Sequence, residues 1–210
     1  MVTDNDGATG VDTVSVKVNP AAEQTLTLQP ANAPDDRMIV SIGGADQSFN
    51  GGQEWVIDAW TVGGDPFFGR KAFKFDLSSI PASATVLSAN LFLYSNTPPQ
   101  NGNLVDANFG TDNSLVLQRI TAAWTPATTT WTNQPATTTA NQVIIPHTPL
   151  SVLDVNVDVK NLVGAMVSGG NYGFLIKLQN EVAYTSRAFV GSHHPTKQTK
   201  HPKLVIIYRL

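Results

Sequence analysis

Arg70-Lys-Ala-Phe-Lys-Phe-Asp76 and Val86-Leu-Ser-Ala-Asn-Leu-Phe-Leu-Tyr94 are the two stretches that decide the fold. In the first, Ala72 falls on the opposite face from Phe73, because successive side chains of a strand point to opposite sides. The second alternates in two rows, Leu87, Ala89, Leu91 and Leu93 against Val86, Asn90, Phe92 and Tyr94. Leu77-Ser-Ser-Ile-Pro81 between them reads as a tight turn. The two stretches therefore predict consecutive β-strands.

The rest of the chain repeats this pattern of short alternating strands bounded by turn residues. Further strands are expected at residues 24–29, 37–42, 54–60, 114–120, 152–159, 171–178, 183–190 and 203–208. One short helix is expected at residues 160–168, where Gly169 and Gly170 end it. About ten strands separated by turns predict an all-β fold, a two-sheet antiparallel β-sandwich of the jelly-roll type, over residues 23–210.

The composition indicates a neutral polar surface. Of the 210 residues, 41% are apolar and only 14% are charged, with a net charge of −3. A typical soluble domain is about one quarter charged. This balance offers no basic surface for nucleic acid, and no run reaches the roughly 18 apolar residues of a membrane span, so we expect no nucleic-acid partner and no membrane insertion. The chain has no cysteine, which excludes disulfides and thiol chemistry.

Residues 1–22 read differently from the remainder. Thr3-Asp-Asn-Asp-Gly7 is a cluster of turn formers, and Val11-Asp-Thr-Val-Ser-Val-Lys-Val18 alternates as a half-buried strand. Asn19-Pro-Ala-Ala22 follows as a linker. A single strand cannot build its own core, so we expect it to pair with the main domain or with the sheet edge of another chain. The second arrangement predicts self-association through residues 1–20.

Several segments, in order along the chain, are similar to one family of domains. They are Phe73-Lys-Phe-Asp-Leu-Ser-Ser-Ile-Pro81, Ala84-Thr-Val-Leu-Ser-Ala-Asn-Leu-Phe-Leu-Tyr94, Thr130-Trp-Thr-Asn-Gln-Pro135, Asp158-Val-Lys-Asn-Leu-Val163, Asn171-Tyr-Gly-Phe174 and Pro202-Lys-Leu-Val-Ile-Ile-Tyr208. The family that they resemble is the DNRLRE-type, disaggregatase-related β-sandwich domain, which is grouped with carbohydrate-binding modules that recognise acidic polysaccharides such as alginate. Two departures are Lys160, where the family often has Thr, and Pro126, where an acidic residue is common.

The resemblance implies a function and a location. It implies a non-catalytic, secreted carbohydrate-binding module that targets a larger extracellular protein to a polysaccharide, in the extracellular space or at the cell surface. Residues 1–22 resemble the last strand of an immunoglobulin-like repeat of the polycystic-kidney-disease (PKD) type, so neighbouring domains of a larger chain are expected as partners. The alternative is a structural module of a cell-surface adhesin, stalk or filament that assembles through exchange of this N-terminal strand.

Candidate ligand-binding residues follow from the chemistry of sugars. Sugar rings stack on aromatic faces, and their hydroxyl and carboxylate groups bind polar and cationic side chains. The candidate platforms are Trp60, Trp131 and Tyr184, and the candidate cationic groups are Arg70, Arg187, His193, His194 and Lys197. For each Trp the alternative is a core or loop-anchoring role, and Trp55 is assigned to the core because it shares a strand face with Ile57.

A structural calcium ion is the one candidate cofactor. Asp35, Asp36 and Asp46 lie near turns and could supply oxygen ligands, although Asp also favours turns without any metal. His193 and His194, with His201, could instead form a three-nitrogen metal site, but adjacent histidines are more typical of loop surface.

No catalytic arrangement is visible in the sequence. No Ser, His and acidic residue share the context of a nucleophile, and no pair of carboxylates is singled out for glycoside cleavage. The sequence therefore predicts that the chain is not an enzyme.

Overall fold

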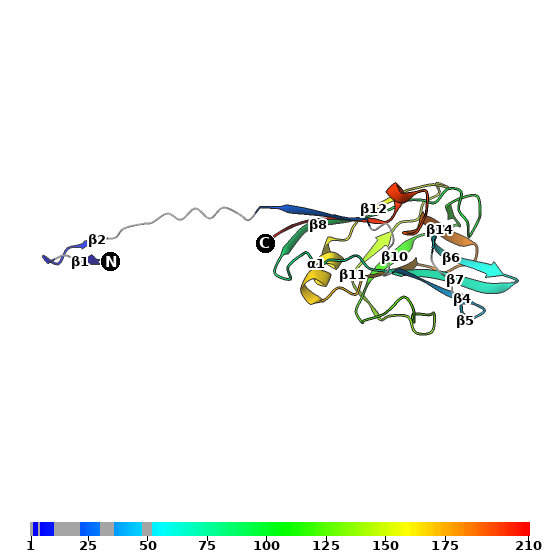
Figure 1. Cartoon of the computed structure of the whole chain (residues 1–210), viewed down its shortest axis with the longest axis horizontal. Helices are drawn as coiled ribbons and strands as arrows, with labels where there is room; N and C mark the ends of the chain where they lie inside the picture. Colours follow the sequence, from blue (N-terminus) through cyan, green and yellow to red (C-terminus); the bar gives the residue numbers. More distant parts are fainter. Residues whose placement is uncertain (1, 4, 11–21, 30–35, 48–51) are drawn as a thin grey trace.

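The computed structural model describes residues 2–3, 5–10, 22–29, 36–47 and 52–210. Within them two antiparallel sheets pack face to face, which confirms the predicted all-β sandwich (Figure 1). The smaller sheet contains β3 (Gln24–Leu28), β8 (Thr85–Leu93), β12 (Val155–Asp158) and β15 (Lys203–Arg209). Its strand order is β12-β8-β15-β3.

The larger sheet forms the other layer. Its strands are β4 (Asp36–Ile42), β5 (Ala45–Gln47), β6 (Glu54–Val62), β7 (Asp65–Phe73), β9 (Asn108–Phe109), β10 (Leu115–Ile120), β11 (Thr137–Ile145), β13 (Phe174–Leu178) and β14 (Thr185–Val190). They follow the order β11-β10-β13-β7-β6-β14-β9, with β4 paired to β7 and β5 to β4. The chain crosses between the layers at β3–β4, β7–β8, β8–β9, β11–β12, β12–β13 and β14–β15, as a jelly-roll path requires.

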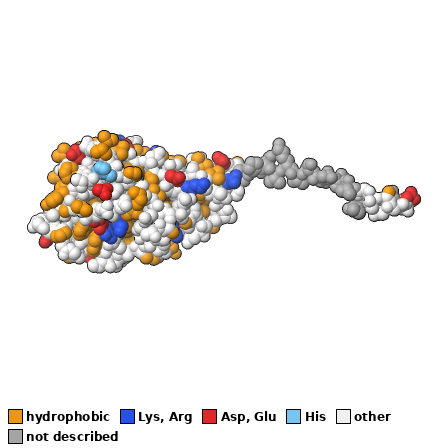
Figure 2. Space-filling model, turned by 180° about the vertical axis from the view of Figure 1, so that it is seen from behind, with side chains coloured by type: hydrophobic (Ala, Val, Ile, Leu, Met, Phe, Trp, Pro, Cys, Tyr) orange, Lys and Arg blue, Asp and Glu red, His pale blue; other side chains and the backbone are white. Residues whose placement is uncertain are grey.

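The main core lies between the sheets. Trp55 is 1% exposed and its ring centroid lies 4.7 Å from that of Phe73, so its predicted core position is confirmed. Alternate residues of β8, namely Ala89, Leu91 and Leu93, are fully buried against this core. Outside the core the charged side chains are few, and Figure 2 shows one face of the molecule on which polar and hydrophobic groups predominate.

The predicted alternation of buried and exposed side chains is wrong at the start of β8. A register shift opposite Ile207 and Tyr208 leaves Leu87 without a partner on β15. Such a β-bulge inserts one residue and moves the preceding side chains to the other face. Val86 is therefore buried in the core at 7% exposure, whereas Leu87 is only half-buried.

The predicted helix is confirmed as α1 (Lys160–Gly169), which lies beside β8 at one end of the sandwich (Figure 1). Its apolar face buries Leu162, Val163 and Met166. The Asp158 carboxylate accepts a hydrogen bond of 2.8 Å from the Lys160 backbone N–H and so satisfies one donor at the helix start. A short 3₁₀ turn, η1 (Gln198–Lys200), precedes β15.

Within the sandwich three strands, β5, β9 and β11, were not expected. The longest is β11, whose first residues, Thr137-Thr-Thr-Ala-Asn-Gln142, are polar and partly exposed because the strand lies at the edge of the sheet. Asn141 has a φ of 60°, and the register against β10 shifts near Leu117 and Arg119, so the alternation of the strand is broken. An exposed and irregular strand leaves no hydrophobic period to detect.

At the N-terminus β1 (Val2–Thr3) pairs with β2 (Thr9–Gly10). Residues 5–7 of the turn predicted at residues 3–7 lie between these strands. The strand predicted at residues 11–18 and the first three residues of the linker predicted at residues 19–22 lie outside the described residues, so pairing of this segment stays a prediction. In the described part of the chain no helix has the length and apolar character needed to cross a membrane.

Candidate functional site

Three aromatic side chains meet at one end of the larger sheet. Tyr184 directly precedes β14 and its side chain is 54% exposed. Its ring meets that of Trp60, near the end of β6, edge to face at 5.2 Å, and Trp60 in turn lies 5.8 Å from Phe109 of β9. Two of the predicted platform residues, Trp60 and Tyr184, are thus in contact, and the tyrosine ring reaches solvent.

A pocket of about 570 Å³ opens beside this aromatic group. Its walls carry amide, hydroxyl, imidazole and carboxylate groups, from Asp106, Asn108, Asn113, His147, Thr148, Ser151 and Thr185. Asn113 and Thr148 hold one wall rigid, because each donates to the other through hydrogen bonds of 3.0 Å. Tyr184 itself lines the pocket, so an aromatic face and several hydrogen-bonding groups converge on one space.

Arg187 lies buried behind this pocket, with 0% exposure. Its Nε donates to Asn108 Oδ1 at 3.2 Å and its Nη1 to the Pro146 carbonyl at 3.3 Å. Among the described residues nothing accepts a hydrogen bond from Nη2, and no carboxylate lies within 4.0 Å of the guanidinium. Burial lowers the pKa of Arg187 to about 10, so the side chain remains a cation at neutral pH.

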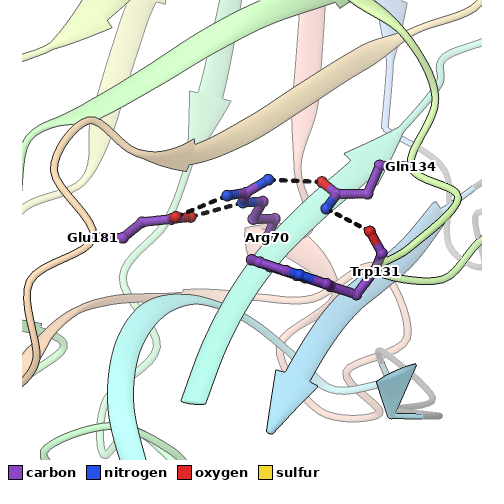
Figure 3. A network of polar contacts seen from close by, with 4 residues as sticks. All are labelled: Arg70, Trp131, Gln134 and Glu181. Atoms are coloured by element: carbon purple, nitrogen blue, oxygen red, sulfur yellow. Dashed lines mark hydrogen bonds and ion pairs between the residues drawn. The ribbon is translucent and has the colours of Figure 1, made fainter. Parts of the chain in front are cut away.

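Arg70 and Trp131, two other predicted residues, form a separate network (Figure 3). Arg70 on β7 makes a bidentate ion pair with Glu181, with both nitrogen–oxygen distances at 2.7 Å. Its Nη1 donates to Gln134 at 2.9 Å, and its guanidinium carbon lies 4.2 Å from the centre of the Trp131 ring. The same ring stacks on that of Phe68, with the two ring centroids 5.7 Å apart. The network fastens the loop around Trp131 to the sheet, as the loop-anchoring alternative predicted.

Replacing Arg70 by Lys is expected to loosen this loop. Lysine keeps the charge but has no planar fork to bind Glu181 through two hydrogen bonds while covering the Trp131 ring. Because the ion pair is partly exposed, we expect a loss of only about 1 kcal/mol, which corresponds to about 2–4 °C in melting temperature for a domain of this size. Thermal unfolding followed by circular dichroism measures it, and an unchanged melting temperature would contradict the anchoring role.

His193, His194 and Lys197 lie in a third place, after the end of β14. The Lys197 ammonium donates to Asn96 Oδ1 and to the Thr97 carbonyl, and His194 Nδ1 accepts from the Lys197 backbone N–H at 3.2 Å. Burial, followed by the charge of Lys197, lowers the pKa of His194. His193 is exposed. The structure therefore does not bring these residues to the pocket beside Tyr184.

The residues predicted to bind calcium do not converge either. Asp35 lies outside the described residues. Asp36, at the start of β4, forms a buried ion pair of 2.9 Å with Lys71, whereas Asp46, next to the β4–β5 turn, accepts a hydrogen bond of 2.7 Å from Thr132 Oγ1. An extended strand separates the two carboxylates. Within the described ranges, no group of three or more His, Asp or Glu side chains is placed to hold a metal ion.

Comparison with known families identifies the family of the sandwich. The model of carbohydrate-binding module family 96 matches residues 29–208, which is nearly the whole sandwich. The chain belongs to this family. A family 96 module is a non-catalytic domain, which agrees with the prediction that the chain is not an enzyme. No curated protein matches the chain. The finer DNRLRE-type assignment and the PKD-type tail stay predictions.

Sequence reasoning on this family 96 module missed several pocket residues. Asn108 and Phe109 fall in the segment that we interpreted as a long polar loop, and His147 follows an edge strand that was not expected. They come from separate parts of the chain. Pairing of β9 with β14 places Asn108 and Phe109, whereas His147 is held by a hydrogen bond of 3.2 Å from the Asn113 backbone N–H to its Nδ1. No local motif marks them, so the sequence held no signal for this convergence.

Proposed function

We propose that this family 96 module binds an acidic polysaccharide in the pocket beside Tyr184 and thereby holds a larger extracellular protein on that polysaccharide. The family supports a carbohydrate ligand. The acidic character of the ligand, the extracellular location and the targeting role are the parts of this proposal that go beyond the family.

Tyr184 supports stacking of a sugar ring. More than half of its side chain is exposed, and the edge-to-face contact with Trp60 holds the tyrosine ring in place. The apolar face of a pyranose packs on such a ring, while the hydroxyl groups at its rim bind nearby donors and acceptors. Thr111, His147 and Ser151, which are exposed, supply groups of this kind in the adjoining pocket.

Arg187 is the single observation that favours an acidic sugar. It is a fully buried cation, and no carboxylate of the described residues compensates its charge. Its hydrogen bonds run to Asn108, which lines the pocket, and to Pro146, the neighbour of the pocket residue His147. A uronate carboxylate in the pocket would face this charge across Asn108, where the low dielectric leaves the attraction poorly screened.

Replacement of Tyr184 by Ala tests the pocket. We expect affinity for alginate or polygalacturonate, measured by isothermal titration calorimetry, to fall at least about tenfold, because loss of a buried aromatic anchor costs about 1.4 kcal/mol or more. Tyr184→Phe keeps the ring and is expected to bind within about twofold of the unmodified protein. Val182→Ala, an exposed change in the same loop, is the second control. Unchanged binding in Tyr184→Ala would exclude this pocket.

Salt tests the acidic part of the proposal separately. Affinity for alginate is expected to decrease as the NaCl concentration rises, because counterions screen the attraction between charges. Xylan and cellulose, which serve as neutral comparisons, are expected to bind weakly at every salt concentration. Tight, salt-independent binding of a neutral glycan that is still lost in Tyr184→Ala would retain the pocket but contradict an acidic ligand.

A further inference from the structure

The outward face of the smaller sheet carries a second group of residues suited to a ligand. We call this surface the outer sheet face. Cross-strand partners share a face, and the register places them in three rows: Asn156, Phe92 and Lys203; Asp158, Asn90, Val205 and Thr27; and Ser88, Ile207 and Thr25. None of these residues belongs to the pocket beside Tyr184.

The centre of the outer sheet face is aromatic and cationic. Lys203 Nζ lies 4.6 Å from the centre of the Phe92 ring and 5.9 Å from that of Tyr94. Both rings and the lysine are half-buried although they project from the solvent side of the sheet. Contact with a ring face is worth about 0.5–1 kcal/mol to an exposed cation, which keeps Lys203 folded over the sheet instead of extended into water.

The edges of the outer sheet face are polar and uncharged apart from one carboxylate. Thr25 and Thr27 on β3 and Asn156 on β12 are exposed. Asp158, also exposed on β12, uses its Oδ1 to accept from the Lys160 backbone N–H. Hydroxyl and amide groups on both sides of an aromatic centre can donate to and accept from the hydroxyls of a sugar.

Lys203 has a charge that the protein does not neutralise. In the parts of the chain that the structure describes, no carboxylate lies within 4.0 Å of its ammonium, in contrast to Arg70 with Glu181 and Lys71 with Asp36. A ligand that places an anionic group over Phe92 would therefore gain an ion pair without breaking one. A protein partner would need a carboxylate at the centre of its contact, where charged residues are depleted.

We propose that the outer sheet face is a second polysaccharide-binding surface, with Phe92 and Tyr94 as its apolar centre and Lys203 as its anion contact. The ligand class rests on the proposed function, whereas the location is independent of it. Two surfaces on one rigid sandwich would let a single polymer chain, or two neighbouring chains, bind at both. Binding at the second surface would then be intramolecular and would raise the apparent affinity for a polymer over that for a short oligosaccharide.

The test uses Lys203→Met, which removes the charge and keeps an unbranched side chain. Lys177→Met is the matched control, because Lys177 is a half-buried lysine on a strand of the other sheet. Calorimetry with a uronate tetrasaccharide is expected to give two sites per chain for the unmodified protein and for Lys177→Met, but one for Lys203→Met. Apparent affinity for the polymer is expected to fall about tenfold or more in Lys203→Met only.

Amide chemical shifts show which residues lie near the bound oligosaccharide. Titration of the ¹⁵N-labelled protein is expected to shift Asn90, Phe92 and Asn156 in addition to residues around Tyr184. Phe92→Leu, which preserves apolar volume on the sheet, is expected to remove the first set of shifts and not the second. One site per chain in the unmodified protein, with shifts confined to the pocket, would overturn the second surface.

The two proposals fail in different ways. If Tyr184→Ala abolishes all binding and Lys203→Met changes nothing, the pocket stands and the second surface is excluded. If Lys203→Met abolishes all binding and Tyr184→Ala changes nothing, the outer sheet face is the binding surface and the pocket is excluded. No binding of any oligosaccharide by the folded protein would overturn both.

Discussion

Raising the pH from about 5 to about 9 is expected to destabilise this protein by roughly 4 kcal/mol through one side chain, Asp58. Asp58 lies on β6 and is 2% exposed. Burial, and then the nearby charge of Glu54, raises the pKa of its carboxyl from 3.8 to about 8. The folded state therefore holds a proton that the unfolded state has already released.

The surroundings of Asp58 explain why its carboxyl stays neutral. Glu54, whose charge contributes to the raised pKa of Asp58, is buried and accepts hydrogen bonds of 2.7, 3.0 and 2.9 Å from Asn96, Gln100 and Asn101. In the described structure Asp58 Oδ1 has no hydrogen-bond partner, so an ionised carboxylate there would be uncompensated.

The sign of the change in stability with pH follows from the direction of the pKa shift of Asp58. A raised pKa contributes stability in full below the unfolded value of 3.8, and that stability is lost as the pH rises through about 8. Between about pH 5 and about pH 8 the loss is roughly 1.4 kcal/mol for each pH unit. Asp58→Asn has no proton to release, so its free energy of unfolding is expected to change much less over this interval.

Urea denaturation of both proteins across this pH range provides the measurement. The difference between their unfolding free energies is expected to shift in favour of Asp58→Asn as the pH rises. Asp65→Asn, at an exposed aspartate on β7, controls for removal of a carboxylate and is expected to follow the unmodified protein. Parallel pH profiles for Asp58→Asn and the unmodified protein would show that Asp58 is ionised in the fold.

Lys71→Met is expected to destabilise the fold by about 3–5 kcal/mol, the usual cost of leaving one member of a buried ion pair alone. Lys71 is 0% exposed and its ammonium lies 2.9 Å from Asp36 Oδ1. It also lies 5.0 Å from the centre of the Trp55 ring. Asp36 would keep two neutral donors, Trp55 Nε1 at 3.3 Å and Ser192 Oγ, but no cation.

A double-mutant cycle distinguishes this charge effect from lost packing. Asp36→Asn in the Lys71→Met background removes the uncompensated carboxylate and keeps a group that can accept from Ser192. We expect the double variant to be more stable than Lys71→Met alone, as measured by urea denaturation at neutral pH. If the losses in unfolding free energy of Lys71→Met and Asp36→Asn simply add in the double variant, Lys71 stabilises the fold through its aliphatic chain.

Much of this fold could be predicted from periodicity. The alternation of apolar residues around Leu91 identified β8, and the glycines Gly169 and Gly170 identified the end of α1. Both signals are local in the sequence. The edge strand β11 could not be predicted, since its exposed threonines do not alternate with buried apolar residues. The bulge at Leu87 depends on the partner strand β15, which local sequence does not contain.

The candidate site was predicted in part. Trp60 and Tyr184 were predicted as sugar platforms for their aromatic rings, and the two rings are in contact. Trp131 was predicted for the same reason and Arg70 for its charge, but these two side chains contact each other and fasten a loop. Residue type cannot separate these roles, because the separation depends on which partner each side chain finds. Arg187 illustrates the same point, since a cation expected at the surface is buried behind the pocket.

The backbone of Tyr184 adopts a φ of 64°, in the left-handed region that residues with a side chain rarely occupy. This backbone conformation is set when the chain folds, and the edge-to-face contact with Trp60 holds the ring. A ring that is already held in place loses little freedom when a ligand binds. Calorimetry on the pocket should therefore show a small entropic penalty for association. The free and sugar-loaded forms should superimpose around this residue, so the module would act as a rigid template.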